Sequence, residues 1–215
     1  METPNNPSEA QVSLKKAMLI IVAVIITVMA AGLFVGYRFF WNKFDDTPLA
    51  DRQLKVLNEY QKSDPSNPYI LLKKGDALVV KQDLPTALKE YQNAYSLAPN
   101  NPDVNFRLGL IFNQLKDYDK AIPFLEFAAT KLIFNYPAAY NLALAYYETN
   151  QLDKAVGAYE KAMKIEPSAA DTYYELSRVY QKKGDLKKAL EYVEKALNFV
   201  PDYPEALQQK KLLTK

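Results

Sequence analysis

The fold is decided by a pattern that occurs four times: TALKEYQNAYSLAP (residues 86–99), KAIPFLEFAATKLI (120–133), KAVGAYEKAMKIEP (154–167) and KALEYVEKALNFVP (188–201). Each copy begins 34 residues after the previous one, and its second and ninth residues are alanines. A fixed period of this length is typical of stacked helix–turn–helix units. The sequence therefore predicts an all-α solenoid, in which each unit contacts its neighbours.

Small residues recur where paired helices are expected to cross. They are the alanines of the pattern and the eighth residue of each 34-residue copy: Ala87, Ala94, Ala121, Ala128, Ala155, Ala162, Ala189 and Ala196, with Gly75, Gly109, Ala143 and Ser177. The distance between two packed helices depends on the side chains at their contact. We therefore expect these positions to be buried at close helix crossings.

Helix ends are also marked in each copy. We place the copies at residues 68–101, 102–135, 136–169 and 170–203. Asn67-Pro68 and Asn101-Pro102 each put a capping side chain before a proline that suits the first helical turn. A turn between two helices is expected at the same place in every copy: Gln82-Asp83, Lys116-Asp117, Asn150-Gln151 and Gly184-Asp185.

These residues resemble the tetratricopeptide repeat (TPR) family, which also has a small residue at position 8, alanines at positions 20 and 27, and proline at position 32 (here Pro99, Pro167 and Pro201). The resemblance implies a right-handed superhelix of antiparallel helix pairs. A partial copy is expected before it, within residues 42–67, with a helix over 49–63. A polar capping helix is expected over 205–213, within residues 204–215.

The second copy departs from the pattern, because Ile133 stands where proline is expected. One interpretation is an exposed apolar patch at Ile133 and Phe134 that marks a docking site. The favoured alternative is that the helix runs longer and these residues pack beneath the next repeat.

The N-terminal part has a different composition. Residues 1–16 are polar and are expected to be a disordered tail. Residues 17–37 carry no charge and would span about 31 Å as a helix, close to the thickness of a bilayer core. Aromatic residues continue to Trp41, as in an interfacial belt. We expect a single transmembrane helix within residues 17–41. Gly32 and Gly36 could pair two such helices into a homodimer, although glycines are common in membrane helices.

Two questions about this segment stay open. Val28-Met29-Ala30 satisfies a signal-peptidase pattern, but the apolar run continues well beyond it, which favours a retained anchor. The Lys and Arg counts on the two flanks are nearly equal. We expect the N-terminus in the cytoplasm and the repeats on the extracytoplasmic side. In this arrangement the short N-terminal tail stays in the cytoplasm and the C-terminal domain is translocated, which is the simpler route of membrane insertion.

Composition excludes several kinds of chemistry. The chain has no histidine and no cysteine, and its formal net charge is +2. Disulfides, thiol nucleophiles and the common zinc sites are thereby excluded, and histidine acid–base catalysis with them. Basic residues are scattered, unlike those of a nucleic-acid binder. We expect no enzyme activity, no cofactor, no metal, no nucleic acid and no small-molecule substrate.

The TPR resemblance implies a concave groove lined by the first helix of each repeat. The residues that it assigns to the groove are Tyr69, Leu72, Phe106, Leu110, Asn113, Tyr140, Leu144, Tyr147, Tyr174, Arg178 and Gln181. Position 5 forms a row of Leu72, Phe106, Tyr140 and Tyr174, and aromatic residues are common binding anchors. The alternative is a slightly rotated face, with some of these residues in the core.

A protein or peptide partner is the expected ligand of this groove. The chaperone-carboxylate clamp of some TPR proteins is disfavoured, because only Arg178 matches it. We expect a membrane-tethered scaffold or assembly factor for a membrane or envelope complex. The alternative is a self-oligomerising structural membrane protein.

Overall fold

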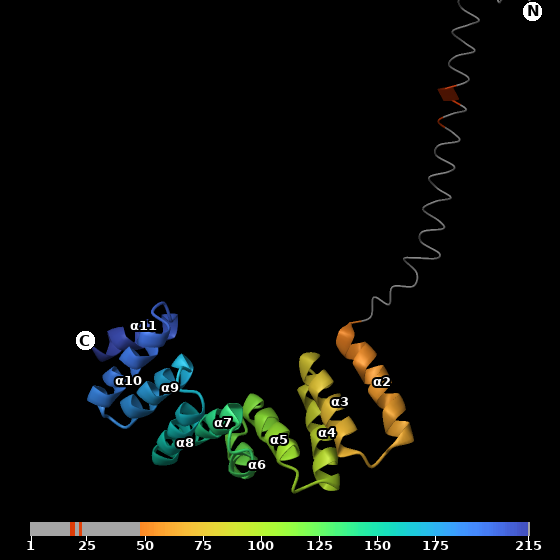
Figure 1. Ribbon diagram of the computed structural model, residues 1–215, viewed down its shortest axis with the longest axis horizontal. Helices are drawn as coiled ribbons and strands as arrows, with labels where there is room; N and C mark the ends of the chain where they lie inside the picture. The colour runs from red at the N-terminus through yellow and green to blue at the C-terminus, as the bar shows by residue number, and fades with distance from the viewer. Residues whose placement is uncertain (1–17, 20–21, 23–47, 215) are drawn as a thin grey trace, which may run out of the picture. The chain divides into compact units, whose positions relative to one another are not determined.

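A computed structural model describes residues 18–19, 22 and 48–214 of the chain. Between residues 48 and 214, every regular element is a helix (Figure 1). The helices are α2 (Leu49–Ser63), α3 (Pro68–Val80), α4 (Leu84–Leu97), α5 (Pro102–Gln114), α6 (Tyr118–Lys131), α7 (Tyr136–Glu148), α8 (Leu152–Ile165), α9 (Ala170–Lys182), α10 (Leu186–Phe199) and α11 (Pro204–Leu213). The predicted all-α solenoid is confirmed.

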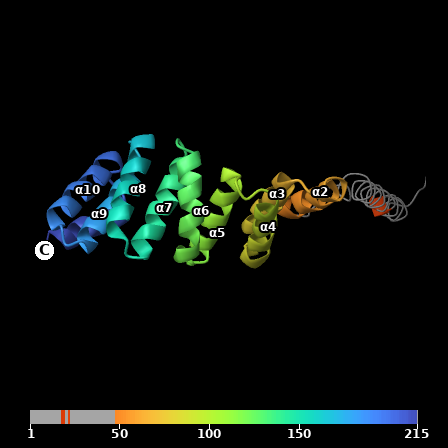
Figure 2. The ribbon, with the colours of Figure 1, turned by 90° about the horizontal axis from the view of Figure 1, so that it is seen from below.

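The helices of residues 49–214 stack side by side in chain order (Figure 2). Each first helix (α3, α5, α7 and α9) packs most extensively against its own second helix (α4, α6, α8 and α10). The four first helices begin at the four predicted copy starts. The expected partial-copy helix is α2, and the expected capping helix is α11.

Most of the predicted membrane span lies outside the described residues. Of residues 17–37, only Met18, Leu19 and Val22 are described, and all three are helical. Among the helices that the structure describes, none is long and apolar enough to cross a bilayer. The disordered tail, the aromatic belt, and Gly32 with Gly36 fall outside the described residues, so these predictions stay predictions.

The small residues lie where the pattern placed them. All eight alanines of the pattern are fully buried. An added Cβ atom at Gly75 would lie 2.3 Å from Tyr91 Cε1, and one at Gly109 would lie 2.4 Å from Leu125 Cγ. The first and second helices of these repeats therefore touch through a glycine against a large side chain.

Helix ends follow the predicted signals. The side chain of Asn101 accepts hydrogen bonds from the backbone N–H groups of Asp103 and Val104, and Asn67 caps α3 in a similar way. The turn inside each repeat holds one residue with positive φ: Gln82 at 63°, Lys116 at 61°, Asn150 at 60° and Gly184 at 80°. Each first helix thus ends in a left-handed residue, the usual way to reverse a chain after a helix.

The favoured expectation for Ile133 is wrong. Helix α6 ends at Lys131, as early in its repeat as the other second helices, and Ile133 and Phe134 are 56% and 84% exposed. The physical reason is the cap of α7: Asn135 accepts a hydrogen bond from the N–H of Ala138. This cap starts α7 at Tyr136 and leaves both apolar side chains on a surface loop.

The glycine contact gives a direct test of the packing. Gly109→Ala should lower the free energy of unfolding by about 1–3 kcal/mol, because the added methyl overlaps Leu125. Gly157→Ala is the matched control, since nothing lies within 4 Å of its added Cβ. It should raise stability by up to about 1 kcal/mol through helix propensity. Urea denaturation of both variants measures the difference, and equal stabilities would contradict the packing.

Candidate functional site: the first-helix face

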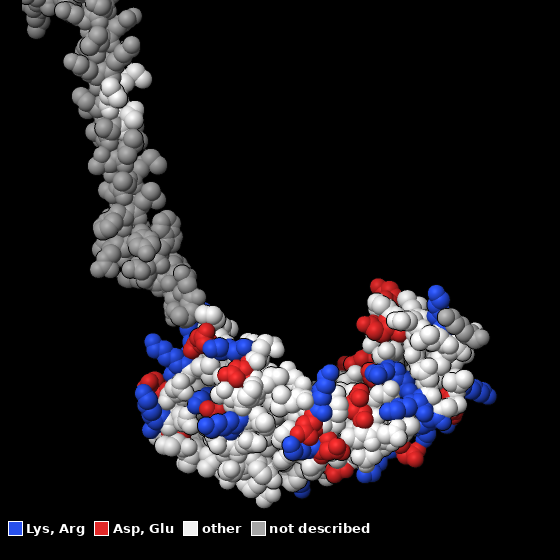
Figure 3. Space-filling view, turned by 180° about the vertical axis from the view of Figure 1, so that it is seen from behind, with Lys and Arg blue, Asp and Glu red and all other residues white. Residues whose placement is uncertain are grey.

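The first helices form one face of residues 49–214. Helix α3 contacts α5, and α5 contacts α7, whereas no two second helices in this part of the chain contact each other to the same extent. Closer spacing on one side bends such a stack toward that side. Figure 3 shows a surface that is hollowed, with acidic and basic side chains intermixed. The first-helix face is therefore the concave one.

Two hollows open between α3 and α5. The first, of about 260 Å³, is lined by the predicted Tyr69 and Leu72, together with Lys73, Asp103 and others. The second, of about 210 Å³, is lined by the predicted Leu110. Tyr69 is 62% exposed. This part of the predicted groove offers apolar walls with charged rims.

The predicted residues differ in accessibility. Leu72, Phe106 and Asn113 are buried, with 6%, 7% and 8% of their surface exposed. Tyr140, Leu144, Tyr147, Tyr174 and Arg178 are half-buried. Gln181 is exposed and accepts a hydrogen bond from Gln209 at 2.9 Å. The position-5 row is thus buried at its N-terminal end and partly accessible at Tyr140 and Tyr174. That any of these residues binds a partner stays a prediction.

A polar network that the groove prediction did not include joins three helices. Asp76 of α3 accepts a hydrogen bond from the Tyr91 hydroxyl of α4 at 2.8 Å. Asp76 also forms an ion pair with Arg107 of α5, whose Nε lies 2.9 Å from its carboxylate. Burial raises the pKa of Tyr91, so its hydroxyl stays protonated as a donor. The signal in the sequence was a carboxylate and a guanidinium 31 residues apart, which places them on neighbouring first helices.

A second cluster surrounds Arg178 of α9. Its guanidinium lies over the rings of Tyr147 and Tyr174, 4.8 and 5.9 Å from their centroids. It donates to both carboxylate oxygens of Glu175, at 3.0 and 2.8 Å. Tyr203 packs against Tyr174 with ring centroids 5.3 Å apart. The groove prediction contained Arg178 and both stacked tyrosines, but not Glu175 or Tyr203.

The electrostatics of this cluster favour a neutral surface. Burial raises the pKa of Glu175, and the adjacent guanidinium of Arg178 opposes that rise. Burial also raises the pKa of Tyr203 to about 12, so this hydroxyl is uncharged at neutral pH. Because Arg178 is already paired with Glu175, it is poorly placed to capture a free carboxylate. The cluster offers flat aromatic faces and a planar cation to a peptide.

Within residues 18–19, 22 and 48–214, no three histidine, cysteine or carboxylate side chains gather as metal ligands would.

Comparisons with known proteins agree with this architecture, which is that of a helical-repeat interaction domain. Residues 75–116 and 143–184 match a model described as TPR repeat, and residues 170–203 match one described as tetratricopeptide repeat. The chain therefore carries tetratricopeptide repeats, as its sequence predicted. Repeats of this kind are typically interaction modules without catalytic activity. No curated protein matches the chain significantly.

Solved structures share the fold. YrrB, described as a TPR protein with an unusual peptide-binding site, is 25% identical, with a TM-score of 0.71, over 75% of this chain and 84% of YrrB. MamA from Desulfovibrio magneticus RS-1, from residue 41 to its end, is 26% identical, with a TM-score of 0.68, over 72% of this chain and 88% of the MamA chain.

The Arg178–Glu175 pair makes a testable contribution to stability. Arg178→Ala should lower the free energy of unfolding by about 2 kcal/mol at neutral pH, because it leaves a buried carboxylate without its cation. Its loss should raise the pKa of Glu175 further in the folded state. Protonation then favours folding, so the variant should lose stability as pH rises above the ordinary glutamate range and recover toward acid pH.

Urea denaturation across a pH series measures this effect. Adding Glu175→Gln to Arg178→Ala is the control, because it removes the titrating group and should flatten the difference in pH dependence. A deficit that is the same at every pH would show that Arg178 acts by packing alone.

Proposed function

We propose that this protein holds a segment of another polypeptide on the first-helix face and acts as a scaffold or assembly factor for a membrane or envelope complex. The observation that carries the proposal is the Arg178 cluster, where Tyr147 and Tyr174 remain half-buried beside a charge-paired guanidinium. Partly exposed aromatic and arginine side chains are typical anchors of protein interfaces. The similarity to YrrB, with its peptide-binding site, supports the same function.

Membrane tethering is the second part of the proposal. It rests on the uncharged residues 17–37 and on the aromatic residues that follow them. We place the N-terminus in the cytoplasm and the repeats on the extracytoplasmic side. A tether would keep the repeats close to the membrane, where the subunits of a membrane complex are found.

Photo-crosslinking tests the binding face. A benzoyl-phenylalanine at Tyr69 or at Tyr147 should crosslink to a cellular polypeptide, because both residues belong to first helices and are at least partly accessible. The same residue at Gln92, exposed on the second helix α4, is the control and should give little product. Mass spectrometry identifies the captured chain.

Two results would contradict this proposal. Equal crosslinking yields at Gln92 and Tyr147 would show that partners do not prefer the concave face. Products that contain only this chain would favour a self-oligomerising structural protein, with Gly32 and Gly36 as its pairing surface.

Thiol labelling tests the topology, and the absence of cysteine makes it direct. A cysteine at Gln208, exposed on α11, should react with a membrane-impermeant maleimide in intact cells with a permeable outer envelope. A cysteine at Ser8 should react only after the membrane is lysed. The opposite labelling pattern would reverse the proposed orientation. Release of the whole chain from membranes by carbonate washing would contradict the proposed transmembrane anchor.

A further inference from the structure

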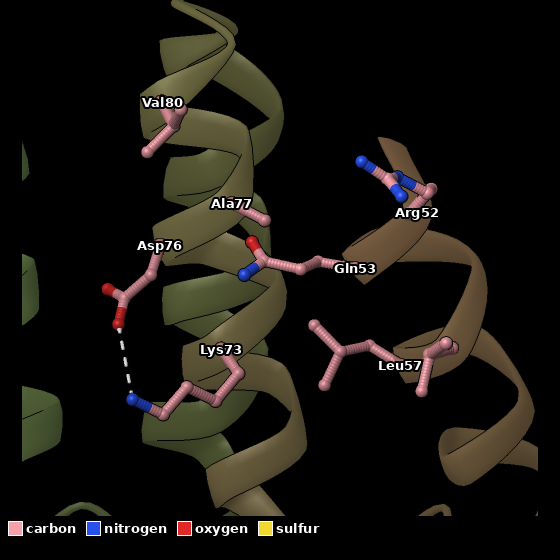
Figure 4. A pocket seen from close by; sticks show the side chains of 8 residues that line it. Arg52, Gln53, Leu57, Lys73, Asp76, Ala77 and Val80 are labelled. Atoms are coloured by element: carbon pink, nitrogen blue, oxygen red, sulfur yellow. Dashed lines mark ion pairs between the residues drawn. The ribbon is translucent and has the colours of Figure 1, made fainter. Parts of the chain in front are cut away.

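A hollow of about 500 Å³ separates α2 from α3 on the side away from α5 (Figure 4). Its walls are largely apolar, with charged groups at the rim. Helix α2 contributes Arg52, Gln53, Val56 and Leu57, and α3 contributes Lys73, Asp76, Ala77 and Val80. Val56 and Val80 are 51% and 72% exposed, which is unusual for aliphatic side chains that face each other across a groove.

The α3 wall of this hollow is a surface built to receive a helix. Its four residues occupy positions 6, 9, 10 and 13 of the first repeat. In α5, the residues at the same four positions are those that face α3 across the 210 Å³ hollow: Arg107, Leu110, Ile111 and Gln114. In α5, these positions thus face the first helix of the preceding repeat. At α3, no described helix lies there.

The α2 wall has the matching character. Helix α2 corresponds to a second helix of the repeat, but Ala50 is the only residue of α2 that is buried. Leu57 occupies the position of Tyr91, which α3 covers almost completely in the next repeat. The groove therefore has the walls of a repeat whose first helix is not among the described helices.

The register of the repeat breaks in the sequence just before α2. Every turn inside a repeat has positive φ at one position, and one period upstream of Gln82 that position is Pro48. Proline fixes φ near about −65°. One period upstream of Gly75, the sequence has Trp41, whereas position 8 of the four repeats is Gly75, Gly109, Ala143 and Ser177.

We propose that an amphipathic helix of a partner protein occupies this groove. Its apolar stripe would cover Val56, Leu57, Ala77 and Val80. A carboxylate at its position 9 would meet Lys73, just as Asp76 at position 9 of α3 meets Arg107 at position 6 of α5. Lys73 can take this role because its side chain is 44% exposed, although its ammonium already lies 3.9 Å from Asp76 and 5.1 Å from the centroid of the Tyr69 ring. Arg52 adds a second positive charge at the rim.

A second copy of this chain fits the groove less well. The residues at position 9 of its other first helices are Leu110, Leu144 and Arg178, and the same position in α11 is Leu212. None of them supplies a carboxylate to Lys73. The carboxylate of Asp76 is engaged with Tyr91 of its own repeat and Arg107 of the next repeat. Charge complementarity thus selects a different protein.

The experiment uses the full chain in mild detergent and a fluorescent peptide with the sequence of residues 102–114, in which Leu110 is replaced by aspartate. This helix naturally packs on Leu125, which occupies the same repeat position as Leu57. Fluorescence anisotropy should show saturable binding. Lys73→Glu should weaken it at least about tenfold, and a peptide with lysine at the same position should restore binding to that variant.

Two further variants complete the design. Val80→Asp should also weaken binding, because it places a charge on the apolar wall next to the peptide. Lys89→Glu, exposed on α4, changes charge equally away from the groove and should leave the dissociation constant unchanged. Tyr147→Ala should leave peptide binding intact, which separates this groove from the proposed concave site.

Peptide affinity that Lys73→Glu does not alter would overturn the proposal. A photo-crosslinker at Val80 gives a second criterion. Crosslinking to the peptide supports the proposal. Crosslinking to residues 34–46 of the same chain, or to a second copy despite excess peptide, would show that the groove belongs to another occupant.

Discussion

The close approach of one glycine to one large side chain sets the geometry of this domain. At Gly75 and Gly109, the first helix lies so near its partner that a single methyl group would overlap Tyr91 or Leu125. Interiors are close-packed, so a helix pair cannot relax around such an overlap without moving apart. The buried alanines impose the same proximity in every repeat, and a regular stack follows from repeating one contact.

The polar residues between repeats act on this stack in a second way. Asp76 with Arg107 joins two first helices, whereas Glu175 with Arg178 lies within α9 beneath two tyrosines from successive repeats. Partly buried pairs of this type add little net stability over apolar packing, but they are costly to separate. They hold the first-helix face in one arrangement, which suits a surface that must present aromatic rings at fixed spacing.

The sequence predicted the elements well and the faces less well. Helix starts followed from Asn67, Asn101 and the 34-residue period, because capping and periodicity are local properties. The burial of Leu72 and Phe106 depends on how far each helix rotates about its axis, which spacing alone does not determine. The favoured prediction for Ile133, that it would pack beneath the next repeat, was wrong for another reason. The cap at Asn135 decides where α7 begins, and this local effect outweighs the burial of two apolar side chains.

The departures from the period carry as much information as the period itself. Pro48 stands where the chain would need positive φ, and in α2 Gln53 and Tyr60 replace the two small residues that let helices nest. A merely decayed repeat would be expected to lose its apolar surface, since exposed aliphatic side chains favour aggregation. Here the apolar surface persists on both walls of the groove, although the repeat pattern breaks at Pro48, Gln53 and Tyr60. This combination is expected of a groove between α2 and α3 that accepts a helix from another protein.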